Sequence, residues 1–178
     1  NASLVRCMTA RGLKLAPWLE RRGPDRWTAH DGTGLTIGFE EDPLEIFQMG
    51  TYCDTCLAPD GCSFFSVFAN AADVNKKILF ARDSHGRIVG RCLIAISDAG
   101  GILTFHPYCH DGKFGFADYG REAAQRLAKE MGTFVVTDGP VATLVSTEWY
   151  DDGSVDLCGR FPCLEDGSAY RKVLLTVT

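Results

Sequence analysis

Three apolar runs separated by tight turns constrain the fold of this chain more than any other feature. The runs cover residues 78–82, 87–97 and 102–108, and they are rich in Ile, Leu and Val. The two turns, 83–86 and 98–101, carry Asp and Gly, which favour reversal of the chain. Because the connections are so short, consecutive strands must run antiparallel. The pattern therefore predicts a three-stranded antiparallel meander.

Two amphipathic helices are predicted on either side of the meander. Residues 63–77 and 117–131 carry apolar side chains at nearly helical spacing. Ser63 and Asp118 are suitable N-caps for them, and Gly132 can end the second helix. Weaker patterns predict a short helix at 17–22 and strands at 35–39, 133–137, 141–149 and 170–177.

The composition limits the domain organisation and the partners. With 46% hydrophobic and 23% charged residues, the 178-residue chain is typical of one globular domain, spanning 1–178. Within it we expect an N-terminal extension at 1–50, a core at 63–149, and a loop with a terminal strand at 150–178. A net charge of -5 argues against nucleic acid as a partner. The lengths of the apolar runs argue against a membrane.

The compartment follows from the N-terminus and the cysteines. No charged segment followed by an apolar stretch opens the sequence, so a signal peptide is not expected. Eight cysteines are too few for a disulfide scaffold of this size. We therefore expect a cytoplasmic chain with reduced thiols and, since it does not begin with Met, a part of a longer protein.

The order of the predicted elements is a helix, three antiparallel strands, a helix and a further strand. Over residues 63–149 this order resembles the GNAT family of N-acyltransferases. The resemblance implies an α+β fold with a central, mostly antiparallel sheet and flanking helices. It also implies acyl-coenzyme A as cofactor, with its pyrophosphate at the start of the second helix, where backbone N–H groups lack partners. The matching loop lacks the family's paired glycines, and its expected cofactor-binding residues are Gly112, Lys113 and Gly115.

The end of the third meander strand carries the candidate catalytic residues. His106, Tyr108 and His110 alternate along the strand and would share one face. An acyltransferase requires a base for the incoming amine and an acid for the departing thiolate, and Tyr108 and His110 have suitable chemistry. The acceptor would be a small-molecule or protein amine, drawn to the acidic turn at 148–153. Alternatively, the strand end at 106–110 and the turn at 148–153 are polar segments that face water and have no catalytic or binding role.

The cysteines form the second candidate site. Cys53 and Cys56 have the C-x-x-C spacing of one zinc knuckle, and Cys158 and Cys163 could supply a second pair. Four thiolates would make a closed structural zinc site, with Cys62, Cys109, His106 and His110 as competing ligands. Free or buried thiols and a disulfide are the alternatives to this zinc site.

Two further functions stay open from the sequence. The chain could be a non-catalytic binding or regulatory domain of the same fold, braced by zinc. It could also be a reactive-thiol protein, because a cysteine at a helix start has a lowered pKa. Cys62, directly before the predicted helix at 63–77, is the main candidate nucleophile, together with Cys56.

Overall fold

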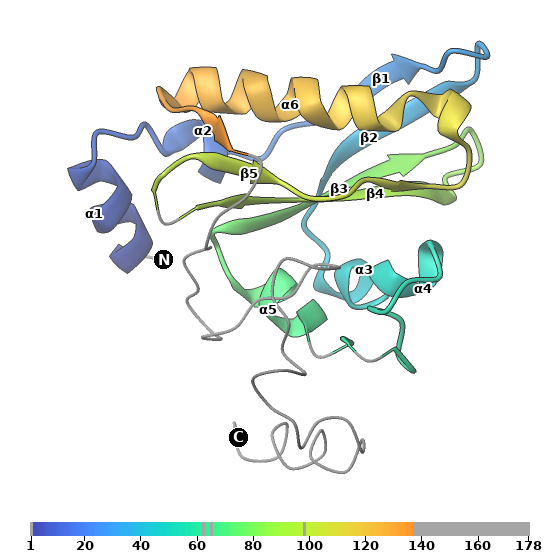
Figure 1. The fold of residues 1–178 in the computed structure, drawn as a ribbon, viewed down its shortest axis with the longest axis horizontal. Coiled ribbons are helices and arrows are strands. Elements are labelled where there is room, and N and C mark those ends of the chain that lie inside the picture. Colours follow the sequence, from blue (N-terminus) through green and yellow to red (C-terminus); the bar gives the residue numbers. More distant parts are fainter. Residues whose placement is uncertain (1, 62, 65, 98, 137–178) are drawn as a thin grey trace.

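A computed structural model describes residues 2–61, 63–64, 66–97 and 99–136 of the chain. Its strands form one curved sheet in the order β1-β2-β3-β4-β5-β7, and β6 pairs with β4 beside β5 (Figure 1). Every pairing is antiparallel except that of β5 with β7. The strands are β1 Asp25–Thr28, β2 Gly34–Glu40, β3 Lys76–Arg82, β4 Ile88–Ile96, β5 Ile102–Thr104, β6 Tyr108–Cys109 and β7 Val135–Val136.

Helices cover both faces of the sheet. The long helix α6 lies across one face, and the short helices α3, α4 and α5 lie against the other (Figure 1). Among the described helices, none is long and apolar enough to cross a membrane. The bounds are α1 Ala2–Ala10, α2 Ala16–Leu19, α3 Pro43–Phe47, α4 Met49–Tyr52, α5 Ser66–Ala72 and α6 Phe116–Met131, with a 3-10 turn at Gly112–Phe114.

The central strand β4 is buried along its whole length because it has a core on each side. Cys92, Ile94 and Ile96 pack in the core beneath α6, whereas Leu93 and Ala95 pack in the core beneath α3–α5. This alternation follows from the two-residue period of a strand. A strand covered on both faces is expected to be an apolar run, and β4 fits this pattern except at the buried Arg91.

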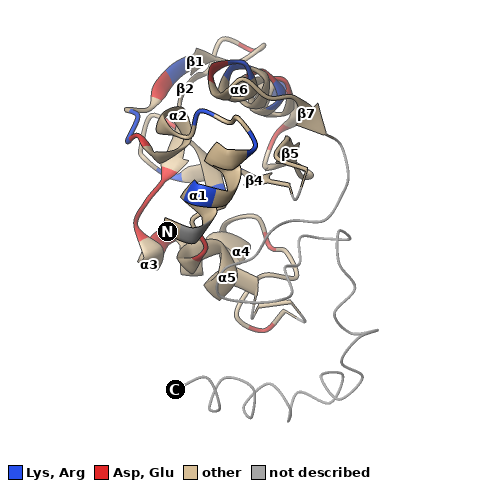
Figure 2. Ribbon diagram, turned by 90° about the vertical axis from the view of Figure 1, so that its left-hand side faces the viewer, with Lys and Arg blue, Asp and Glu red and all other residues tan. Residues whose placement is uncertain are grey.

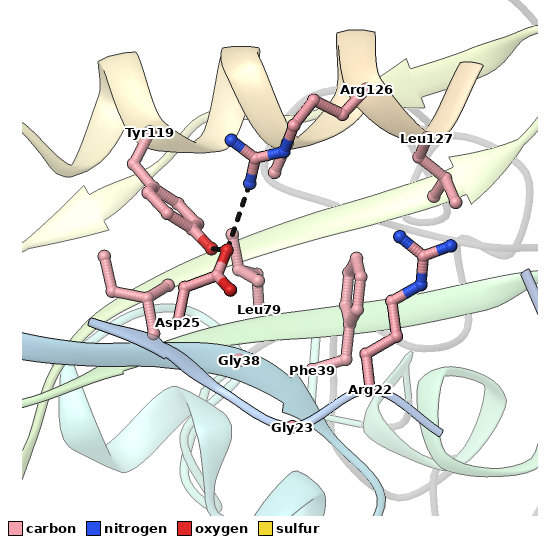
Figure 3. A pocket seen from close by; sticks show the side chains of 11 residues that line it. Arg22, Gly23, Asp25, Gly38, Phe39, Leu79, Tyr119, Arg126 and Leu127 are labelled. Atoms are coloured by element: carbon pink, nitrogen blue, oxygen red, sulfur yellow. Dashed lines mark hydrogen bonds and ion pairs between the residues drawn. The ribbon is translucent and has the colours of Figure 1, made fainter. Parts of the chain in front are cut away.

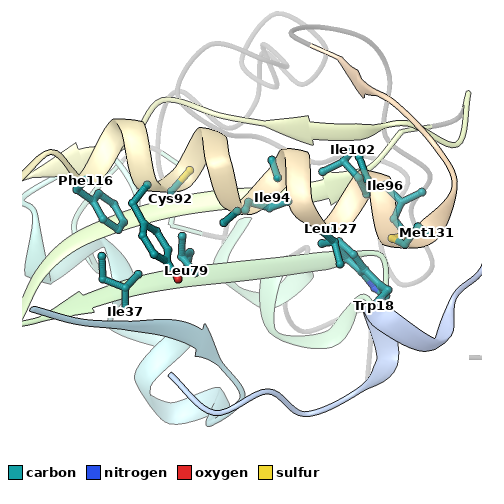
Figure 4. Close-up of a cluster of buried hydrophobic side chains, with 14 of the residues drawn as sticks. Trp18, Ile37, Leu79, Cys92, Ile94, Ile96, Ile102, Phe116, Leu127 and Met131 are labelled. Atoms are coloured by element: carbon teal, nitrogen blue, oxygen red, sulfur yellow. The ribbon is translucent and has the colours of Figure 1, made fainter. Parts of the chain in front are cut away.

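The larger core is built on the apolar face of α6 (Figure 4). Phe116, Leu127 and Met131 point from the helix onto the sheet, and Trp18 of α2 closes the far end. The indole N–H of Trp18 donates to the carbonyl of Val74 at 2.6 Å, so its polar atom is satisfied inside the core. On the outer face of α6 and on β1, acidic and basic residues lie close together (Figure 2).

The predicted fold class and GNAT-like order of elements are confirmed. The meander strands pair in sequence order, and α6 then carries the chain to β7, which runs parallel to β5. Gly132, with a φ of 72°, ends α6 as predicted. The predicted strands at 141–149 and 170–177 lie outside the described residues.

Two predictions were wrong in detail, and two elements were not predicted at all. The helix predicted at 63–77 is confined to Ser66–Ala72, because Lys76 and Lys77 pair with β4 as the start of β3. The third meander strand is broken into β5 and β6. The weakly patterned N-terminal region contains α1 and β1, which the sequence did not predict.

Two cysteines outside the predicted zinc site differ in burial. Cys92 lies buried in the core beneath α6, whereas Cys7 is exposed on α1.

Candidate functional site

A one-residue bulge breaks the third meander strand. Ile94 pairs with Thr104, whereas Arg91 pairs with Tyr108. The third strand therefore advances by four residues over a length in which β4 advances by three. Pro107 lies in this bulge, and its lack of a backbone N–H suits a position without a ladder hydrogen bond. Bulges redirect side chains and are common beside active sites.

The end of the broken strand and the start of α6 enclose a cavity, here called the N-terminal cavity. Its volume is about 290 Å³. Strands β5 and β7 pair at only two positions. The cavity lies beyond this pairing, next to β6, which pairs with β4. Its lining residues are His106, Pro107, Tyr108, Cys109, Asp111, Gly112, Gly115, Phe116, Ala117 and Asp118.

Helix α6 begins without a side-chain cap. Gly115 is its N-cap in the left-handed conformation, with a φ of 65°, and makes no side-chain hydrogen bond. Asp118, the predicted cap, lies inside the first turn and pairs with Arg121 at 3.0 Å. The N–H groups of Phe116 and Ala117 have no partner within the helix, and the positive end of the helix dipole is at this point.

The loop before α6 is held by the β1–β2 hairpin. The backbone N–H of His30 donates to the carbonyl of Lys113, and the indole N–H of Trp27 donates to the carbonyl of Phe114, both at 3.0 Å. The carboxylate of Asp111 accepts the N–H of Lys113 at 2.9 Å. These bonds fix the loop, so the helix start is presented to the cavity in one orientation.

The three polar strand residues are not brought to one place. The rings of His106 and Tyr108 meet edge to face at 4.9 Å, and both side chains line the N-terminal cavity. The guanidinium of Arg91 lies 4.7 Å from the centre of the Tyr108 ring. His110 is not among the lining residues, and its Nε2 lies 2.5 Å from the carbonyl oxygen of Tyr52. A hydrogen bond there requires a proton on Nε2, which in the neutral ring leaves Nδ1 as the acceptor.

A second cavity, here called the lateral cavity, lies between α6 and the first strands of the sheet (Figure 3). Its volume is about 170 Å³. On one side, the hydroxyl of Tyr119 donates to the carboxylate of Asp25 at 2.5 Å, and Arg126 contacts the same oxygen at 3.2 Å. Burial and the hydrogen bond to Asp25 raise the pKa of Tyr119.

The sequence analysis did not single out this cluster. Tyr119 lies within the helix predicted at 117–131, and its side chain is buried. Its polar partner, Asp25, is 94 residues away in a region with little pattern. A buried tyrosine usually needs a partner for its hydroxyl, and this was the one available signal.

The cysteines show no metal site among the residues that the structure describes, where no three or more His, Cys, Asp or Glu side chains converge. Cys53 and Cys56 are half-buried after α4. Burial raises the pKa of Cys53 and of Cys109. Cys62, Cys158, Cys163 and the acidic turn at 148–153 lie outside the described residues. The four-thiolate site remains a prediction, which a metal analysis of the purified chain tests.

Comparison with known proteins shows a distant likeness to solved structures that include the following two. No family model and no curated protein matches the chain. A ribosomal-protein-alanine N-acetyltransferase from Brucella melitensis biovar Abortus 2308 is 18% identical, with a TM-score of 0.44 over 66% of this chain and 97% of that one. The GNAT domain of S. lividans PAT is 15% identical, with a TM-score of 0.44 over 66% of this chain and 76% of that one. Likenesses of this size identify neither an activity nor a substrate.

Proposed function

We propose that the chain is a GNAT-like N-acyltransferase domain that binds acyl-coenzyme A in the N-terminal cavity. The observation that carries the proposal is the position of this cavity, of about 290 Å³, between the bulged strand end and a helix start that no side chain caps. A cavity at a helix N-terminus offers backbone donors and a positive dipole end to an anion. The GNAT-like order of elements is consistent with this place for a pyrophosphate.

The residues around the helix start fit such a group. The free N–H groups of the first turn would hold the pyrophosphate, and the exposed Lys113 would offset its charge. Gly112 is exposed and leaves the main chain without side-chain cover, whereas the ring of His30 lies against Gly115. The two nearby carboxylates are already engaged, Asp111 by the Lys113 N–H and Asp118 by Arg121. Acyl-coenzyme A would supply an activated thioester when bound.

Tyr108 and His110 would move the protons. His110, held by Nε2 at the Tyr52 carbonyl, would accept the proton of the amine at Nδ1, directly or through one water. Tyr108, which lines the cavity, would give up the proton of its hydroxyl to the leaving group. The nearby guanidinium of Arg91 stabilises the negative charge that then develops on the phenol. The acceptor would be a small-molecule or protein amine.

A calorimetric titration of acetyl-coenzyme A into the reduced protein tests the proposal. Ala117→Glu places a negative charge in the first turn of α6 and should weaken binding at least about tenfold by repulsion of the pyrophosphate. Gln125→Glu makes the same charge change on the exposed face of α6 and should leave the affinity unchanged. Acid in the first turn does not destabilise a helix, so Ala117→Glu should remain folded.

Three results would count against the proposal in different ways. Absence of binding at millimolar acetyl-coenzyme A would end it. Equal weakening by both charge changes would remove the helix start from the site. Binding without acylation of any amine in a screen would favour the non-catalytic binding domain instead.

A further inference from the structure

We infer that the lateral cavity is a binding site for a small apolar monocarboxylate, of the size of benzoate. The inference does not depend on the proposed acyltransferase activity, because the two cavities share no lining residue. The residues that line the lateral cavity are Arg22, Gly23, Asp25, Ile37, Gly38, Phe39, Leu79, Tyr119, Ala123, Arg126 and Leu127.

The size and floor of the cavity suit one ring or a short chain. A volume of about 170 Å³ exceeds the roughly 150 Å³ of an engineered apolar cavity that takes up benzene. Ile37, Leu79 and Leu127 are nearly fully buried apolar side chains that face the space. Gly23 and Gly38 lie on the strand side of the cavity (Figure 3). No atom lies near the position of a Cβ at Gly23, whereas Pro24 fills that position at Gly38. An apolar body would therefore displace water from an apolar surface.

Two guanidinium groups supply the polar end of the site. Arg22 and Arg126 line the cavity, and both are partly exposed, with side-chain exposures of 37% and 50%. Arg22 pairs with Glu130 through Nη2, and Arg126 contacts Asp25 through Nη2. Since a guanidinium carries five N–H donors, each group retains donors for a carboxylate.

The acidic neighbours explain why a monoanion is the better ligand. Asp25 is the one carboxylate that lines the cavity, and its Oδ2 already accepts from Tyr119 and contacts Arg126. Glu130 lies beside Arg22 outside the lining. Two guanidiniums against these two carboxylates leave no excess positive charge, so a phosphate dianion is repelled more strongly than a monoanion. A single planar carboxylate matches the edge of one guanidinium. It is also repelled less by Asp25 and Glu130 than a phosphate dianion is.

The test is a titration of benzoate into the whole chain, followed by methyl NMR of Leu79 and Leu127. Benzyl alcohol, of the same size without the charge, and inorganic phosphate, without the ring, are the comparison ligands. We expect saturable binding of benzoate, with both comparison ligands at least about tenfold weaker. Equal affinity for benzyl alcohol would overturn the role of the guanidiniums, and stronger binding of phosphate would overturn the monocarboxylate.

Variants place the ligand in the cavity. Arg22→Gln should weaken benzoate binding about tenfold, whereas Arg21→Gln, on an exposed neighbour that pairs with Glu41, should not change it. Ala123→Leu fills the cavity from α6 and should abolish binding. Circular dichroism shows whether Ala123→Leu is folded. If it is not, the comparison of the Arg22 and Arg21 variants tests whether benzoate binds in the lateral cavity. Equal binding by the Arg22 and Arg21 variants, or no saturable binding of benzoate at millimolar concentration, would refute the inference.

Discussion

The two cavities along α6 are built in different ways. The N-terminal cavity takes its character from the main chain: an uncapped helix start, glycines and a bulged strand. The lateral cavity takes its character from side chains, namely two guanidiniums and a tyrosine–aspartate pair above an apolar floor. A main-chain site depends on how the loop is held, whereas a side-chain site depends on which residues meet. The two should therefore respond differently to substitution.

Phe116→Ala should cause the largest loss of unfolding free energy and should alter the N-terminal cavity. Phe116 is nearly fully buried, begins α6 and lines this cavity. Loss of a buried aromatic ring costs about 3–5 kcal/mol of unfolding free energy, through lost burial and the space left behind. Urea denaturation measures it. Leu44→Ala is the control, because Leu44 is 65% exposed and should cost at most about 0.5 kcal/mol.

Tyr119→Phe should act on the lateral cavity alone. It removes the hydroxyl that donates to Asp25 and should lower the unfolding free energy by about 2 kcal/mol, as for hydrogen bonds to charged groups. A double-mutant cycle with Asp25→Ala separates this bond from other effects. Additive losses in the cycle would show that the two side chains are not coupled. Acetyl-coenzyme A binding should be unchanged.

The same tyrosine should make stability depend on alkaline pH. Its pKa in the folded protein lies above the ordinary value of about 10, because burial and Asp25 disfavour the phenolate. The unfolded chain therefore loses the proton first, and the unfolding free energy should fall as pH rises above about 10. Tyr52, whose pKa burial and Glu45 raise to about 12, adds to the fall. In denaturation experiments between about pH 9 and 11, the unfolding free energy of Tyr119→Phe should fall less steeply with pH than that of the unchanged protein. An unchanged slope would contradict this account.

Gly115→Ala should have the smallest effect on stability, with a selective effect on the N-terminal cavity. The left-handed backbone of Gly115 costs an alanine about 1 kcal/mol, and the added methyl group would lie 3.0 Å from Nε2 of His30. The helix start should shift, and acetyl-coenzyme A should bind more weakly while benzoate binds as before. Equal loss of both ligands would show that the cavities are not independent. Gly86→Ala, at a left-handed glycine that lines neither cavity and where the added methyl group meets no atom, is the control.

Local patterns were sufficient where neighbours in sequence are also neighbours in space. The meander from β3 to β5 and the span of α6 were predictable, because short turns and a 3.6-residue period act over a few residues. The helix predicted at 63–77 failed for the opposite reason. Lys76 lies in a buried ion pair with Asp73 and in the first register pair with β4, so sheet pairing prevailed over helical spacing.

For the candidate sites, the sequence determined which chemical groups are available, and the tertiary structure decided which of them meet. Gly112, Lys113 and Gly115 were predicted at the start of α6 because the loop adjoins the helix in sequence. That His110 contacts Tyr52 while Tyr108 lines the cavity depended on a bulge and on a contact across 58 residues. Asp25 and Tyr119 meet across 94 residues. Such contacts form only when sheet and helix pack into one core, and no local pattern encodes them.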